Sequence, residues 1–152
     1  MNKYPRGHKI VLTADRTLMS EYHRGIFLGF SACVPRGFIP DRLYFPLFCP
    51  SVEVNEDGSS RFAPCGTRKI EAALLDYGFK RGEVIVAHPE HLEEVVGPNT
   101  RVVGITENDP LGMGPATSTF KQLFGGEAYM AVKFKKLLSD PAIRRYRPKV
   151  VV

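Results

Sequence analysis

Four short, mainly apolar runs divide the chain, at residues 9–14, 84–87, 101–105 and 149–152. None of them alternates strictly between apolar and polar positions, as a strand with one face in water would. Continuous apolar runs of this length are typical of strands that helices cover on both faces. The pattern therefore predicts four buried strands.

The segments between these predicted strands have the periodicity of amphipathic helices. Thr67 can cap a helix that Gly78 ends, a second helix is predicted after Pro89, and a third is predicted over residues 127–138. The residues expected to face the sheet from these helices are Ile70, Ala73, Leu74 and Tyr77, then Leu92, Val95 and Val96, then Met130, Ala131, Phe134, Leu137 and Leu138.

Alternating strands and helices predict an α/β fold with a doubly wound parallel sheet. We expect residues 1–152 to form a single domain. The last predicted strand ends the sequence with no helix after it, where a parallel sheet normally continues. The chain is therefore expected to be the N-terminal part of a longer protein.

A long irregular segment, residues 15–66, interrupts the alternation after the first predicted strand. It contains several prolines but also many aromatic side chains, so it is too apolar for a disordered linker and is expected to pack. Within it, residues 42–48 have a strand-like composition broken by Pro46, and residues 55–58 have the composition of a hairpin turn.

The formal net charge is +5, which suits nucleic acid, an anionic cofactor or ordinary solubility. We interpret the basic C-terminal end as a solvated helix face. A nucleic-acid-binding domain is the less favoured alternative, because the basic residues are not interleaved with aromatic ones as in stacking platforms. The basic residues of this end are Lys133, Lys135, Lys136, Arg144, Arg145, Arg147 and Lys149.

No apolar run approaches the roughly 20 residues that span a bilayer, and the N-terminus does not have the pattern of a signal peptide. We therefore expect a cytoplasmic protein with no membrane partner. The three cysteines, Cys33, Cys49 and Cys65, are an odd number and lie far apart in the sequence. Free thiols are the prediction, rather than disulfides or a local zinc or iron–sulfur motif.

Polar residues follow the first predicted strand, at the carboxyl edge where open α/β sheets bind ligands. Asp15 can bind a ligand hydroxyl or amide there, or it can cap the next turn. His23 follows beside Glu21, and a histidine oriented by a carboxylate makes a good metal ligand. A structural role is the alternative for His23.

The strongest candidate site is the long loop of residues 106–119, directly after the third predicted strand. Its hydroxyl, carboxylate and amide groups can bind a ligand, and its glycines permit close approach of the backbone. Its later hydroxyl residues can cap a following helix and offer N–H groups to an anion. A long helix cap beside a solvated loop is the alternative. The residues singled out for cofactor binding are Thr106, Glu107, Asn108, Gly112, Gly114 and Thr117.

Several catalytic and nucleotide-binding motifs are missing from the sequence. The first predicted strand is not followed by GxGxxG, and neither GxxxxGK[ST] nor GxSxG occurs. The residues of the candidate site are therefore expected to bind rather than to catalyse.

Three stretches, VLTADRTLMSEY, GITENDPLGMGPATSTF and YRPKVVV, resemble the N-terminal cobalamin-binding-type domain of radical S-adenosylmethionine proteins. The resemblance implies a flavodoxin-like sheet of order 2-1-3-4 in this chain, with the fifth strand missing. It also implies a cobalamin-binding module that is not catalytic on its own. The implied partner is a radical SAM catalytic domain in cis beyond residue 152, which would carry the iron–sulfur cluster and S-adenosylmethionine.

The resemblance also implies roles for individual residues. A histidine after strand one ligates cobalt in the family, which makes His23 the candidate cobalt ligand here. Thr106 stands where the family has a serine that lines the nucleotide tail of cobalamin, and Asn108 follows two positions later. The alternative is the same fold without cobalamin, acting as an interaction scaffold for the catalytic domain.

Overall fold

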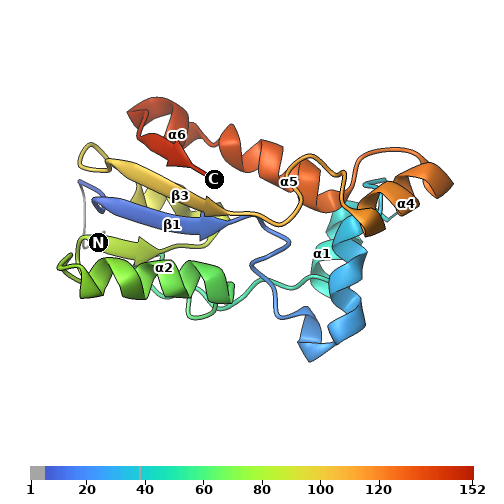
Figure 1. Ribbon diagram of the computed structural model, residues 1–152, viewed down its shortest axis with the longest axis horizontal. Coiled ribbons are helices and arrows are strands. Elements are labelled where there is room, and N and C mark those ends of the chain that lie inside the picture. The colour runs from blue at the N-terminus through green and yellow to red at the C-terminus, as the bar shows by residue number, and fades with distance from the viewer. Residues whose placement is uncertain (1–5, 38) are drawn as a thin grey trace.

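The computed structural model describes residues 6–37 and 39–152, and a parallel sheet of four strands lies at its centre (Figure 1). The strand order is β2-β1-β3-β4, and all three neighbouring pairs are parallel. This arrangement confirms the predicted flavodoxin-like α/β fold. The strands are β1 (Ile10–Ala14), β2 (Val84–Val86), β3 (Val102–Thr106) and β4 (Lys149–Val151).

Helices cover both faces of the sheet, because the connections from β1 to β2 and from β2 to β3 run over opposite faces (Figure 1). One face packs against α2 (Cys65–Asp76), with Leu74 and Phe79 against the strands. The other face packs against α3 (Leu92–Val95), α5 (Tyr129–Leu138) and α6 (Pro141–Tyr146).

Alternate residues of the central strands supply the two halves of the core. Val11 and Val103 are buried beneath α3, α5 and α6, whereas Leu12 and Val86 face α2. Burying one such side chain contributes about 1.5–3 kcal/mol. The continuous apolar runs of the sequence thus reflect a sheet that is covered on both sides.

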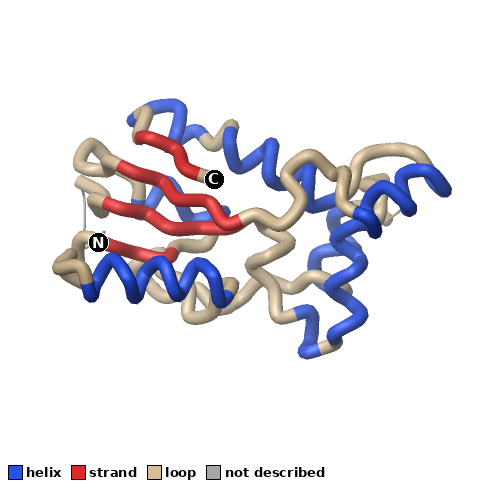
Figure 2. The backbone as a smooth tube through the Cα atoms, in the orientation of Figure 1, coloured by secondary structure: helices blue, strands red, loops and turns tan. Residues whose placement is uncertain are grey.

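A helical lobe extends past the carboxyl ends of the strands (Figures 1 and 2). Part of the lobe comes from the long segment between β1 and α2, and part from the connection between β3 and α5. Its contributors are the 3₁₀ helices η1 (Tyr22–Arg24) and η2 (Ile26–Cys33) and the α-helices α1 (Asp41–Leu47) and α4 (Pro115–Phe124).

The lobe is fixed to the sheet through the first turn of α5. The rings of Tyr44 on α1 and Tyr129 on α5 are buried and stacked, with centroids 3.8 Å apart and planes 5° apart. A short antiparallel bridge also joins Pro35 to Ala128, beside backbone hydrogen bonds that Arg36 and Tyr129 donate. The segment therefore packs, as its aromatic content predicted.

Three local predictions differ from the structure. The strand-like residues 42–48 lie mainly in helix α1. The helix tolerates Pro46 because the proline falls in its last turn, where the missing N–H removes only the bond to the carbonyl of Arg42, an exposed residue. Helix α2 begins at Cys65, so Thr67 is an internal residue and not its cap. Thr117 likewise lies inside α4, whose N-cap is Gly114.

The outward face of α2 also differs from the prediction. Helical periodicity placed Ile70, Ala73 and Tyr77 against the sheet with Leu74, but Tyr77 is 87% exposed and the other two are also exposed. The helix instead turns Thr67 and Leu74 inward. The prediction is therefore confirmed for Leu74 and wrong for Ile70, Ala73 and Tyr77.

The predicted turn at residues 55–58 is confirmed. Val54 and Ser60 form an antiparallel bridge around it, and Gly58 has a φ of +80°. No helix in the described part of the chain is both long and apolar enough to cross a membrane.

Candidate functional site

Two carboxyl side chains meet at the carboxyl edge of the sheet. Ala14 of β1 pairs with Thr106 of β3, so Asp15 and Glu107 each follow the last paired residue of two adjacent parallel strands. Residues in the same register of parallel strands point to the same side and lie about 5 Å apart. The strand register thus brings Asp15 and Glu107 together.

Each carboxyl group has one oxygen fully engaged by its own loop. The Thr17 backbone N–H and hydroxyl donate to Asp15 Oδ1 at 2.6 and 2.7 Å. The N–H groups of Asn108 and Asp109 donate to Glu107 Oε1 at 3.0 and 3.2 Å. These bonds fix both side chains to the backbone.

The second oxygens, Asp15 Oδ2 and Glu107 Oε2, are buried and accept no hydrogen bond from the described residues. Two ionised carboxylates cannot satisfy each other, but one carboxylic acid can donate to one carboxylate. Burial, followed by the neighbouring Asp15 charge, raises the pKa of Glu107 to about 8. Burial also raises the pKa of Asp15, while hydrogen bonds from Thr17 favour its ionised form. With a pKa of about 8, Glu107 is the member of the pair expected to hold a proton at neutral pH, and this proton can satisfy Asp15.

Thr106 lies beside this pair, but its hydroxyl group contacts helix α2. Its hydroxyl oxygen is 2.7 Å from that of Thr67, which is buried in the first turns of α2. This hydrogen bond explains why Thr67 faces the sheet instead of capping its helix. The Thr106 hydroxyl also has a second lone pair for a ligand.

The loop from β3 to α4 is held in shape by Asp109. Its two carboxylate oxygens accept the N–H groups of Met113 at 2.8 Å and Gly114 at 2.9 Å. Gly112 has a φ of +65°, and a Cβ there would lie 3.4 Å from the side chains of both Thr117 and Ala131. The glycine lets the loop close against α4 and α5.

A hollow of about 470 Å³ lies between this loop, α4 and the segment after β1. It includes three of the predicted residues, Asn108, Gly114 and Thr117. A volume of this order suits a small ligand or a part of a large one. The hollow is lined by Leu18, Tyr22, Gly29, Phe30, Ala32, Cys33, Asn108, Asp109, Gly114, Pro115, Ala116, Thr117 and Met130.

His23 lies elsewhere. It is exposed, has a φ of +52°, and lines a second, smaller hollow with Glu21, Arg24, Pro50 and Ser51. Within residues 6–37 and 39–152, no hydrogen bond or ion pair involves its ring. The sequence placed Glu21 beside His23 as an orienting carboxylate, and the structure shows no such contact between them.

The buried histidine of this edge is His88, at the end of β2. Its Nδ1 accepts the Glu90 N–H at 3.2 Å, and its Nε2 lies 2.8 Å from the Ser51 hydroxyl oxygen. Burial, and then the Arg16 and His91 charges, lower the pKa of His88 to about 3. His88 is therefore a neutral structural residue that caps η3 (Pro89–His91) and holds the segment after β1 against β2.

Comparison with protein-family models, with curated proteins and with solved structures finds no match for this chain. Within the described residues, no cluster of three or more histidine, cysteine or acidic side chains could hold a metal ion. The three cysteines are free, with Cys49 buried, Cys33 partly buried and Cys65 exposed.

The predicted site residues thus fall into four groups. Asp15 and Glu107 form the carboxyl pair, and Thr106 contacts Thr67 of α2. Asn108, Gly112, Gly114 and Thr117 line the hollow or shape its loop, and His23 lines a separate hollow. The sequence named both carboxyl residues but not their pairing. Matching the ends of the first and third predicted strands would have revealed it, because parallel strands end in register. The apolar lining, notably Leu18, Phe30 and Met130, had no signal in the sequence beyond its hydrophobicity.

Proposed function

We propose that this chain is a cofactor-binding module, and that its cofactor is cobalamin. The observation that carries the proposal is the hollow beyond β1 and β3, between the two loops that flank the sheet's switch point. In open α/β sheets, that position is where ligands bind. The resemblance of three stretches to cobalamin-binding-type domains supplies the chemical class.

The lining of the hollow suits the nucleotide tail of cobalamin. Leu18, Phe30 and Met130 offer an apolar surface to an aromatic base, and methionine sulfur packs well against rings. The Asn108 side chain, which is exposed, can hydrogen-bond to polar groups at the mouth. These residues would hold the tail, while Asp109 and Gly112 keep the loop in shape.

Cobalt ligation by His23 is not part of this proposal, since His23 lines a different hollow from the residues expected to hold the tail. Bound cobalamin would supply methyl-transfer or rearrangement chemistry to a radical SAM catalytic domain. The chain's own residues bind and orient the cofactor.

Retention of hydroxocobalamin tests the proposal directly. The purified chain is mixed with hydroxocobalamin and desalted, and the absorbance retained per protein is measured. Gly29→Leu adds a side chain at the hollow, where a Cβ has open space around it, and should lower retention about tenfold. Gly66→Leu, also in open space but outside the hollow, should retain as much as the original chain.

Two outcomes would count against the proposal: no retention by a folded chain, or equal loss in both variants. His23→Ala serves as a separate check, because an altered spectrum of the retained cofactor would make His23 a cobalt ligand after all.

A scaffold for a catalytic domain, without cobalamin, is the second candidate function. Large apolar side chains are exposed on the lobe, among them Phe27, Leu47, Leu111, Met113 and Leu123. Exposed apolar groups of this kind often mark protein contacts. A folded chain that retains no cobalamin, yet binds its catalytic domain, would favour this function.

A further inference from the structure

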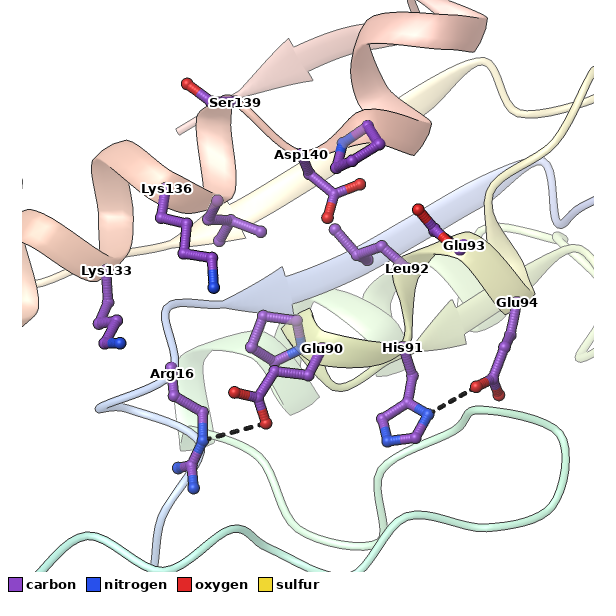
Figure 3. A pocket seen from close by; sticks show the side chains of 13 residues that line it. Arg16, Glu90, His91, Leu92, Glu93, Glu94, Lys133, Lys136, Ser139 and Asp140 are labelled. Carbon is purple, nitrogen blue, oxygen red and sulfur yellow. Dashed lines mark hydrogen bonds and ion pairs between the residues drawn. The ribbon is translucent and has the colours of Figure 1, made fainter. Parts of the chain in front are cut away.

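A third cavity, of about 460 Å³, opens on the face of the sheet that carries α3, α5 and α6 (Figure 3). Arg16 reaches it from the loop after β1, Glu90 from η3, and Lys136 from α5. None of the residues that line the hollow beyond β1 and β3 lines this cavity.

The floor of the cavity is apolar. Leu92 and Leu137 are buried side chains of the main core, and Pro89 and Pro141 add further apolar surface. An apolar floor with a few charged groups at the rim is the usual composition of a small-molecule site.

Two nearly buried cations lie at one end of the cavity. The side chains of Arg16 and Lys133 are only 9% and 13% exposed, and both approach the ring of Phe45, at 4.8 and 4.4 Å from its centroid. Arg16 Nε lies 3.3 Å from Glu90 Oε2, and Lys133 Nζ lies 2.8 Å from Asp41 Oδ2. Each of these cations is thus held in place by a ring and a carboxylate.

A third cation, Lys136, has no such partner. It lies one turn beyond Lys133 on α5, and Figure 3 shows its ammonium group pointing into the cavity toward Glu90. Within the described residues, its side chain makes no ion pair or hydrogen bond. The positive end of the cavity therefore has one more cation than carboxylates.

Apart from Glu90, the acidic residues of the cavity lie toward its other end. Glu94 pairs with His91 at 2.7 Å, and Asp140 accepts the Ala142 N–H as the cap of α6. Figure 3 shows Glu94, Glu93 and Asp140 on the side away from Lys133. The cavity thus has a positive end, an apolar floor and an acidic end.

We propose that this cavity binds a small organic oxyanion, a phosphate or a carboxylate on an apolar body. Lys136 and Arg16 hold the oxyanion, and Leu92 and Leu137 hold the body. Arginine and lysine are the side chains that proteins use for such anions, and arginine binds them with two N–H groups.

Glu90 has a defined part in this binding. It is the carboxylate that occupies Arg16 in the structure, yet 59% of its side chain is exposed. An arriving oxyanion can therefore displace the Glu90 carboxylate into water. The free-energy cost of breaking this ion pair is small, because the pair is already partly exposed. Glu90 acts as a competing counterion.

Titration with phenyl phosphate and with benzoate, followed by amide NMR shifts of Leu92, Leu137 and their neighbours, tests the inference and separates the two oxyanions. We expect saturable shifts with at least one of them and none with benzyl alcohol, which lacks the charge. Lys136→Gln should weaken binding about tenfold, since it removes a charged donor. Glu90→Gln should tighten binding several-fold, because the competitor is gone.

Lys69→Gln is the matched control, because it removes the same charge from the exposed surface of α2, on the opposite face of the sheet. It should bind as the original chain does. The inference is overturned if neither oxyanion shifts these amides, if Lys136→Gln binds equally well, or if Lys69→Gln weakens binding as much as Lys136→Gln.

Discussion

A protonated glutamic acid next to a buried aspartate acts as a hydrogen-bond donor and not as a charge. This is the arrangement of Glu107 and Asp15, whose remaining oxygens are occupied by backbone N–H groups or by Thr17. Residue types alone suggested two independent polar groups at this edge. The strand register brings them together, and the raised pKa of Glu107 indicates that the pair holds a proton at neutral pH.

Stability should therefore depend on pH through Glu107. In the unfolded chain its pKa has the ordinary value of 4.5, whereas in the folded chain it is about 8. Between these values the folded state binds more protons than the unfolded state, so the free energy of unfolding falls as pH rises. The stabilising contribution is complete below about pH 4.5 and lost above about pH 8.

Glu107→Gln should flatten this pH dependence. The amide nitrogen can donate to Asp15 as the protonated acid does, and the amide oxygen can accept the same two N–H groups. Urea unfolding at pH 8 should give a free energy about 1 kcal/mol higher than that of the original chain, a modest gain because Glu107 is partly exposed. Glu93→Gln, on the exposed side of α3, should keep the original slope. An unchanged slope in Glu107→Gln would rule out a shared proton.

At the scale of elements, three residues fix the shape of the loop from β3 to α4, and the sequence predicted their roles only in part. Asp109 binds two N–H groups of the loop, Gly112 adopts a left-handed conformation, and Gly114 caps the helix that follows. The glycines and the acidic residues were predicted to serve a ligand. A helix was predicted to follow the hydroxyl residues 117–119, but α4 already begins at Pro115, because a proline and hydroxyl residues are equally typical of a loop and of a first helical turn.

Gly112→Val should show how much the loop depends on that conformation. A β-branched residue is strained at a φ of +65°, and its Cβ would contact Thr117 and Ala131. We expect the free energy of unfolding, measured in urea, to fall by about 1–3 kcal/mol. Gly66→Val, where a Cβ has open space, should leave it within about 0.5 kcal/mol. A smaller loss at Gly112 than at Gly66 would contradict this account of the loop.

At the scale of the whole molecule, the sheet was predictable and the lobe was not. Four short apolar runs separated by helices specify a doubly wound sheet, because parallel strands need helical crossovers. The prediction that all four are buried is wrong for β4, which lies at the edge of the sheet and is largely exposed. The long segment after β1 has no periodicity of that kind. Its helices depend on contacts with α5, such as the stack of Tyr44 on Tyr129, that lie far away in the sequence.

Tyr44→Ala should therefore destabilise the molecule as a whole. Removing a fully buried ring that stacks on Tyr129 is expected to cost about 3–5 kcal/mol. Because the lobe and the sheet share this contact, far-UV circular dichroism should follow a single cooperative transition. Tyr77→Ala, at an exposed position on α2, should change the free energy of unfolding by less than about 0.5 kcal/mol. Two separate transitions in the original chain would show that the lobe unfolds on its own.

The proton between Asp15 and Glu107 also changes the thermodynamics of refolding. At pH 7 an unfolded chain has released this proton, so each molecule that folds takes one from the surrounding buffer. The heat measured for folding then contains the ionisation enthalpy of that buffer, and it differs between phosphate and Tris at the same pH. With Glu107 protonated, the formal net charge of the folded molecule is one unit more positive than the +5 that counts every glutamate as ionised.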